Sequence, residues 1–175
     1  MKIIKIKLYK FDELSEAAKQ KAIEHFSDIN VAFDWWDPIY EDATESGLKI
    51  TGFDLNRASY VKAHFITSAS ECADYIIKEY DETSELYETA QTFINDYDQL
   101  VEKYSDGIDK NRVAEDNEND FDHDVEDLED EFLKDLCEDY RIILQKDYDY
   151  LTSKEAIIET IEANEYDFKE DGSRL

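Results

Sequence analysis

The sequence predicts an α+β protein: a small antiparallel sheet covered by helices, followed by a helical C-terminal part with one long acidic amphipathic helix. Segments of alternating apolar and polar residues occur before residue 66, whereas apolar residues after it recur at helical spacing. The longest periodic segment runs from about Asp120 to Tyr150. Because strands and helices are segregated along the chain, we expect no parallel βαβ arrangement.

The composition is that of a folded chain despite its charge. Aromatic residues make up 13% and apolar residues 42% of the sequence, and there are only one Pro and four Gly. Disordered acidic chains have few aromatic residues, so we expect a packed core. We expect a small α+β subdomain over residues 1–66 and a helical part over residues 67–175 packed on it, together forming one compact domain.

The first 47 residues predict one strand and two helices. Apolar residues alternate with lysines over residues 2–10, which indicates a half-buried strand of the predicted sheet. Ser15 is placed to cap the first helix and Asp34 to cap the second, with Pro38 in its first turn. Gly47 is expected to end the second helix. These two helices are expected to cover the sheet.

The remaining elements follow in order. Residues 49–55 and 59–65 read as two strands joined by a turn at Asn56-Arg57. Ser68 with Glu71, and Thr152 with Glu155, have the spacing of capping boxes at the starts of two helices, and a further helix is predicted over residues 85–104. Residues 110–120 read as a loop, and Phe168 is placed in a short strand near the C-terminus.

Charge is the feature that bears most directly on function. The chain carries 46 Asp and Glu against 19 Lys and Arg, a net charge of −27. Sixteen of these acids and only three bases lie between residues 106 and 139, whereas the first 21 residues have a net charge of +3. Such a field repels nucleic acid and anionic membranes and attracts basic protein grooves or cations.

The long helix concentrates this charge on one side. Its acids step by three or four residues and therefore share a face, with Asp122 beside its start. The predicted partner-binding residues are Asp120, Asp122, Asp124, Asp127, Glu131, Asp135 and, outside the helix, Trp35. Trp36 is expected in the core instead. The alternative is that the acidic face is only solvated surface.

Nothing in the sequence indicates catalysis. It has no Gly-rich phosphate loop, nucleophile signature or dinucleotide fingerprint. The three histidines match no metal-ligand spacing, and an EF-hand reading that starts at Asp120 fails because Val125 stands where Gly is needed. We therefore expect a protein that is not an enzyme and has no cofactor and no metal site. Cys72 and Cys137 are expected to be buried thiols, although a disulfide between them stays open.

Three segments resemble a family of small acidic proteins encoded by bacteriophages and related mobile elements. The first runs from Tyr9 to Lys19, the second is Asp34-Trp35-Trp36-Asp37 with Tyr40-Glu41-Asp42-Ala43, and the third runs from Leu128 to Leu133 and on through Tyr148–Thr152 to Glu159–Tyr166. The resemblance covers most of the chain and brings no catalytic residues with it.

The resemblance implies a phage protein acting in the cytoplasm of a bacterial host. By analogy with anti-CRISPR and antirestriction proteins, we expect an inhibitor that binds a basic, nucleic-acid-handling defence protein. A CRISPR effector with its guide RNA is the first expectation, with no direct DNA binding and no membrane partner. The alternatives are a carboxylate-rich metal-dependent enzyme, and an acidic antitoxin or assembly protein whose partner is another phage or plasmid product.

Overall fold

The computed structural model describes residues 7–105 and 118–174, which form two compact units. Unit 1 combines residues 1–35 with residues 145–175, and unit 2 comprises residues 36–144. The sequence placed a boundary near residue 66 instead. The structure groups the two ends of the chain because apolar residues near the N-terminus pack against those near the C-terminus. The predicted α+β class is confirmed.

The sheet of unit 2 is a hairpin of β1 (Leu48–Asp54) and β2 (Tyr60–Phe65), which confirms two of the three predicted strands. The described end of the third, residues 7–10, forms only an isolated bridge outside this sheet. The strands pair antiparallel, and the register shifts between Ile50 and Gly52. The turn begins where the carboxylate of Asp54 accepts a hydrogen bond from the backbone N–H of Asn56 at 2.7 Å. One face of the hairpin is buried and the other exposed, as the alternating sequence requires.

Helix α2 (Asp37–Glu45) packs on β1, as expected of the second helix. Pro38 lies in its first turn, but the predicted cap at Asp34 is wrong. Asp34 sits in a tight turn closed by the N–H of Trp35 on the Phe33 carbonyl, at 2.7 Å, so the helix starts later. Gly47 follows the helix end with φ 89°, as predicted for a residue in the left-handed region.

Helices α3 (Ala69–Glu79) and α4 (Glu85–Tyr104) pack against each other. The predicted capping box of Ser68 and Glu71 is confirmed, with the two reciprocal hydrogen bonds at 3.1 and 3.2 Å.

Cys72 and Cys137 are both free, and burial raises the pKa of the Cys72 thiol to about 12. Cys72 is fully buried, whereas Cys137 is half-buried.

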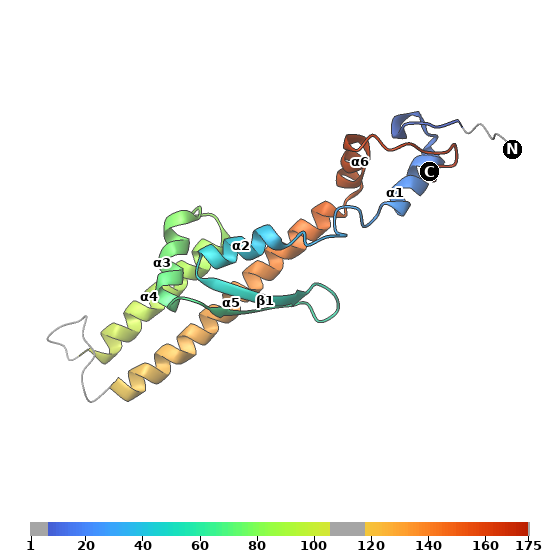
Figure 1. The fold of residues 1–175 in the computed structure, drawn as a ribbon. Coiled ribbons are helices and arrows are strands. Elements are labelled where there is room, and N and C mark those ends of the chain that lie inside the picture. Colours follow the sequence, from blue (N-terminus) through green and yellow to red (C-terminus); the bar gives the residue numbers. More distant parts are fainter. Residues whose placement is uncertain (1–6, 106–117, 175) are drawn as a thin grey trace. The chain divides into compact units, whose positions relative to one another are not determined.

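Helix α5 (Glu118–Leu151) is the long helix that the sequence predicts. Figure 1 shows it alongside α4 and the hairpin within unit 2. Phe132 is stacked on Phe93 of α4 at 4.4 Å and on Phe65 of β2 at 5.7 Å between ring centroids. The buried residues of α5 within unit 2 recur mainly at every fourth position: Phe132, Leu136, Asp139, Tyr140 and Leu144.

A polar network links α2, α5 and the residue that ends α3. The carboxylate of Asp42 accepts hydrogen bonds from the hydroxyls of Tyr80 at 2.7 Å and Tyr140 at 3.1 Å. The Tyr140 hydroxyl also lies 3.4 Å from Oγ of Ser46. Burial raises the pKa of both tyrosines, so they remain neutral donors to the carboxylate.

Unit 1 contains a short 3-10 helix, η1 (Phe11–Glu13), and the helices α1 (Glu16–His25) and α6 (Lys154–Ala163). The apolar face of α1 packs with α6 and Phe168 in one cluster, so the expectation that the first helix covers the sheet is wrong. Ser15 caps α1 as predicted. Ser153 caps α6, not Thr152, whose hydroxyl bonds to a carbonyl at the end of α5.

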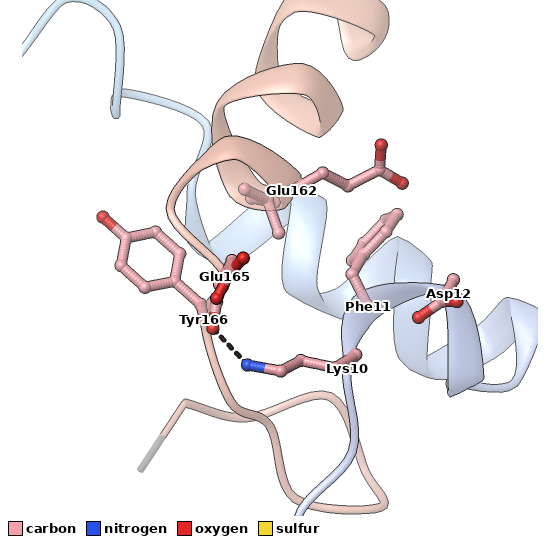
Figure 2. A pocket seen from close by; sticks show the side chains of 7 residues that line it. Lys10, Phe11, Asp12, Glu162, Glu165 and Tyr166 are labelled. Atoms are coloured by element: carbon pink, nitrogen blue, oxygen red, sulfur yellow. Dashed lines mark hydrogen bonds between the residues drawn. The ribbon is translucent and has the colours of Figure 1, made fainter.

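The chain ends of unit 1 meet through the backbone. Tyr9 and Phe168 exchange two N–H···O hydrogen bonds of 2.9 Å, so the described end of the predicted strand over residues 2–10 pairs with the segment around Phe168. Residues 2–6 of that strand lie outside the described residues. The Lys10 ammonium group donates to the Glu165 carbonyl (Figure 2) and pairs with Asp167 at 2.9 Å.

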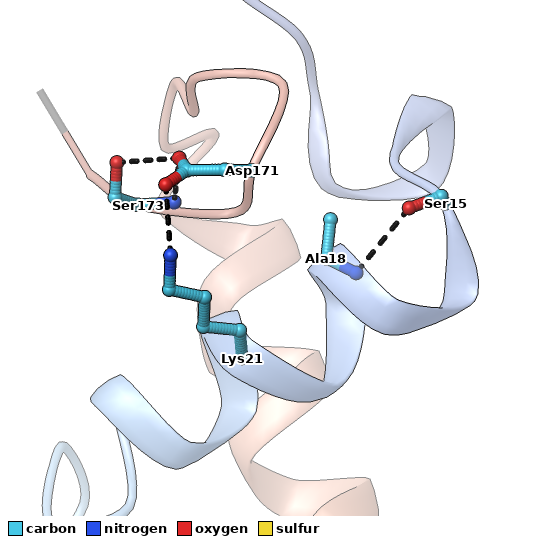
Figure 3. Close-up of polar contacts among 5 residues, drawn as sticks. All are labelled: Ser15, Ala18, Lys21, Asp171 and Ser173. Atoms are coloured by element: carbon cyan, nitrogen blue, oxygen red, sulfur yellow. Dashed lines mark hydrogen bonds and ion pairs between the residues drawn. The ribbon is translucent and has the colours of Figure 1, made fainter.

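The C-terminal turn of unit 1 closes over α1 (Figure 3). The Lys21 ammonium group pairs with Asp171 at 2.8 Å, and this pair together with hydrogen bonds from Ser173 lowers the pKa of Asp171. Gly172 has φ 81°, and a Cβ built on it would lie 2.1 Å from the backbone carbonyl oxygen of Ala18. Only glycine fits this approach of the turn to α1.

Replacing Gly172 with Ala should therefore destabilise unit 1. We expect a loss of at least about 2 kcal/mol, because the left-handed conformation and the backbone clash both oppose a side chain. Amide hydrogen exchange in α1 and α6 measures the loss. Gly52→Ala is the control, since a Cβ there meets nothing within 4 Å. Equal protection in the two variants would contradict the assigned conformation of Gly172.

Candidate functional site

The candidate site is a groove between α4 and α5 in unit 2. The two helices run antiparallel, because Phe93 contacts Phe132 whereas Tyr104, further along α4, contacts Phe121, which is earlier in α5. These contacts, one stacked and one edge-to-face, link the two helices at two places. The walls of the groove are therefore two long helices and not loops.

Two adjoining hollows make up this groove. The larger, about 540 Å³, is lined by Asp96, Gln99, Leu100, Lys103, Asp124, Asp127, Leu128 and Glu131. The smaller, about 100 Å³, is lined by Thr89, Thr92, Phe93, Asp96, Leu128, Glu131, Phe132 and Asp135. Three residues line both hollows, so the groove is continuous along α5 from Asp124 to Asp135, about 16 Å at 1.5 Å per residue.

The structure brings four of the six predicted acids of α5 into this groove. Asp127, Glu131 and Asp135 are exposed and line it, and Asp124 lies at one end. Asp120 and Asp122 are exposed on the same helix but line neither hollow. The predicted set therefore divides into groove residues and residues of the first turns of α5.

Asp124 differs from the other acids because it has partners. Its carboxylate pairs with the Lys103 ammonium group at 2.8 Å and accepts a hydrogen bond from the Tyr104 hydroxyl at 2.7 Å. Lys103, and then Tyr104, lower the pKa of Asp124. These contacts join the C-terminal end of α4 to α5, so Asp124 has a structural role that the sequence did not predict.

The remaining predicted acids have little compensating charge. Asp127 lies 4.0 Å from the ring of His123. In the described part of the chain, Asp120, Asp122, Glu131 and Asp135 form no ion pair. The groove is thus a strip of negative charge whose lining includes two half-buried leucines, Leu100 and Leu128.

Residues of α4 complete the groove, and the sequence did not predict them as site residues. Asp96 lines both hollows together with Leu128 and Glu131, and Leu100 lines the larger one. Their spacing of four residues places them on one face of α4, and that spacing was the available signal. It did not identify them because which face of α4 meets α5 depends on contacts between distant segments.

Asp139 is the only predominantly buried acid of the described chain, at 8% exposure. Its carboxylate accepts a 2.7 Å hydrogen bond from the Thr89 hydroxyl. Burial raises the pKa of Asp139, and the neighbouring acids Glu85, Asp135 and Glu138 raise it further, whereas Thr89 opposes the shift. Folding therefore favours the protonated carboxyl group.

Replacing Asp139 with Asn should stabilise the protein at neutral pH, by on the order of 1 kcal/mol, because the buried charge is removed and an acceptor for Thr89 is kept. The pKa of Asp139 is higher in the folded state than in the unfolded state. Protonation of Asp139 therefore contributes its full stabilisation below the unfolded pKa, and this contribution is lost as the pH rises through the folded pKa. The advantage of the variant should therefore shrink as the pH falls toward 4. Denaturant unfolding at several pH values tests this, and an advantage independent of pH would contradict it.

Trp35 does not lie where a partner contact was predicted. It is 8% exposed, and its ring packs at 5.7 Å from that of Tyr148. Trp36 is only half-buried and contacts Phe53 at 5.5 Å. The structure thus buries Trp35 and leaves Trp36 half-buried, the opposite of the expected assignment.

A separate hollow of about 440 Å³ lies within unit 1 (Figure 2), lined by Lys10, Phe11, Asp12, Ile161, Glu162, Glu165 and Tyr166. Lys10 is its only basic residue and is engaged by Glu165 and Asp167. Among the described residues, no three His, Cys, Asp or Glu side chains are grouped so that they could hold a metal ion. The groove in unit 2 is therefore the better candidate site.

Comparison of the chain with protein-family models, with curated proteins and with solved structures gave no match. The resemblance to acidic phage proteins accordingly stays a prediction. Among the helices of the described residues, none combines the length and apolar character needed to cross a bilayer.

Proposed function

We propose that this protein is a non-catalytic, phage-encoded inhibitor of bacterial defence that binds a basic, nucleic-acid-handling protein in the host cytoplasm. A CRISPR effector nuclease carrying its guide RNA is the partner class that we favour. The observation that carries the proposal is the row of exposed acids on α5, most of them without an ion-pair partner in the described chain.

The proposed mechanism is competition for a cationic channel. Exposed carboxylates on a rod about 10–12 Å across present negative charge at close intervals, as a phosphate backbone does. A partner groove built to neutralise phosphates would accept this rod and lose access to its own guide or target strand. Like charges at helical spacing cost a few tenths of a kcal/mol each, so a chain that retains so many has a reason to do so.

The groove suits the side chains of such a partner. Leu100 and Leu128 offer apolar contact to the methylene stems of Lys and Arg, while Asp96, Asp127 and Glu131 surround the charged head groups. Complementary charge of this kind raises the association rate and makes binding depend steeply on salt. We therefore expect the partner to insert Lys or Arg side chains between α4 and α5.

Affinity capture tests this function. The protein would be immobilised and exposed to lysate from a defence-carrying bacterial host, with a variant in which the exposed α5 acids are replaced as the control bait. The proposal is supported if a nucleic-acid-handling protein is retained only by the natural sequence and is inhibited by it when purified. Retention of another phage or plasmid product would favour the antitoxin or assembly alternative. Equal retention by both baits would exclude the acidic face as the binding surface.

A further inference from the structure

The hairpin carries a surface of opposite sign to the rest of unit 2. Leu48, Ile50 and Val61 are buried on its inner face. Lys49, Lys62 and His64 are exposed on its outer face, and Arg57 is exposed in the turn. From residue 48 to residue 65 there is one acid, Asp54, and it is engaged by the backbone N–H of Asn56.

The register of the hairpin gathers these cations. Lys49 lies directly opposite His64, and Gly52 lies opposite Lys62. Paired residues are about 5 Å apart across the strands and alternate residues about 7 Å apart along them. Within the described residues, neither Lys49, Arg57 nor Lys62 forms an ion pair, although the chain has more than twice as many acids as bases.

The same face offers an aromatic ring and an open approach. Tyr60 is 40% exposed, and the Lys62 ammonium group lies 5.1 Å from the centre of its ring. A Cβ added at Gly52 would meet no atom within 4 Å, so the middle of the face is open at this position. Glycine inside a strand commonly marks a place where another backbone approaches closely.

We infer that the outer face of the hairpin binds the sugar–phosphate backbone of a single-stranded nucleic acid. Lys49, Arg57 and Lys62 would neutralise phosphates, and Tyr60 would stack on a base. An acidic polypeptide would need only the cations, so the exposed ring beside them favours nucleic acid. The inference does not depend on which protein the acidic groove binds.

The net charge of the chain does not forbid this contact. At physiological ionic strength the screening length is about 8 Å, so distant carboxylates act weakly on a strand lying on the hairpin. The contact remains weak for free nucleic acid, and it becomes strong where another protein holds the strand in place. The N–H donor of the exposed His64 ring adds a further hydrogen bond to a phosphate.

Fluorescence anisotropy with a labelled 12-nucleotide oligouridine tests the inference at about 0.15 M ionic strength. We expect the protein to bind with a Kd of about 10⁻⁴–10⁻⁶ M, the range of non-specific binding. The double variant Lys49→Glu/Lys62→Glu should bind at least about tenfold more weakly. Lys78→Glu/Lys134→Glu is the matched control, since it changes two exposed lysines of the same unit and gives the same net charge. The control should lose at most about twofold to threefold.

Two further variants separate access and stacking from charge. In Gly52→Val, the new Cβ meets no atom within 4 Å, so thermal stability should not fall. The side chain covers the centre of the outer face, however, and should weaken binding of the oligonucleotide several-fold. Tyr60→Ala should weaken binding about fivefold or more, because base stacking is lost. Reversal of the α5 acids should leave binding of the oligonucleotide unchanged or stronger, so failure of the proposed function and failure of this inference give different results.

The inference is overturned if the natural sequence does not bind the oligonucleotide, or if the two double variants lose equal affinity. It is also overturned if a labelled polyglutamate binds as tightly as the oligonucleotide and is lost with the same lysines. In that case the hairpin would be a surface for acidic protein segments.

Discussion

Reversing Asp120, Asp127, Glu131 and Asp135 to lysine should weaken binding to the captured partner by at least about 100-fold, since close charge pairs across an interface are each worth more than about 1 kcal/mol. All four side chains are exposed, and three of them line the groove. Asp124 is left unchanged because it holds Lys103 and Tyr104. Titration calorimetry with the purified partner measures the loss.

The matched control reverses four exposed acids of unit 1: Glu24, Glu159, Glu162 and Glu170. It changes the net charge by the same amount, so a loss specific to the α5 variant isolates the groove from long-range attraction. The α5 variant should melt at the same temperature or higher, because repulsion along the helix is relieved. Full inhibition by a folded α5 variant would mean that its acidic face is only solvated surface.

Ionic strength provides a second arm of the same test. Raising it from about 0.05 to 0.5 M shortens the screening length from over 10 Å to a few ångströms. The natural sequence and the control should lose affinity steeply over this range. The α5 variant should respond much less, because the charges that salt screens have been removed.

Truncating Phe132 to alanine should lower the free energy of unfolding by about 3–5 kcal/mol, the largest loss expected from a single core substitution. Its ring is 3% exposed and stacks on both Phe93 and Phe65, so it joins α5 to α4 and to the sheet. Removal leaves a cavity where three elements meet. Urea unfolding followed by circular dichroism measures the change.

Phe33→Ala is the matched control, since the Phe33 ring is 62% exposed. It should change the free energy of unfolding by no more than about 0.5 kcal/mol. A small effect at both positions would show that the packing between α4, α5 and the sheet does not carry the stability of unit 2.

Strong local periodicity explains which parts of the fold were predictable. The alternation around Ile50 and Val61 specified both strands of the hairpin, and the spacing from Phe132 to Leu144 specified the long helix. The cap at Asp34 was not predictable, because a backbone bond between Trp35 and Phe33 places that residue in a turn. Helix ends depend on single hydrogen bonds, whereas helix existence depends on many residues.

The pairing of the two chain ends had no local signal. Phe11 and Phe168 share one apolar cluster, yet nothing in either segment indicates the other.

Contacts between distant segments also limited what the sequence could predict about the candidate site. The acidic face of α5 was predictable from residue spacing alone. That Asp96 lines the groove, and that Asp124 pairs with Lys103, depends instead on how α4 packs against α5. The burial of Trp35 likewise depends on packing that its local sequence did not indicate.

Because unit 1 is built from both ends of the chain, unit 2 can fold before unit 1 during synthesis on the ribosome. Unit 2 is contiguous in sequence and can fold as soon as it has been made. The apolar face of α1 has no packing partner while roughly 110 residues are added, which takes about 5–20 s at ordinary rates of synthesis. During that interval Phe11, Leu14 and Phe26 have no partner from α6, which makes the nascent N-terminal segment a natural client for chaperones.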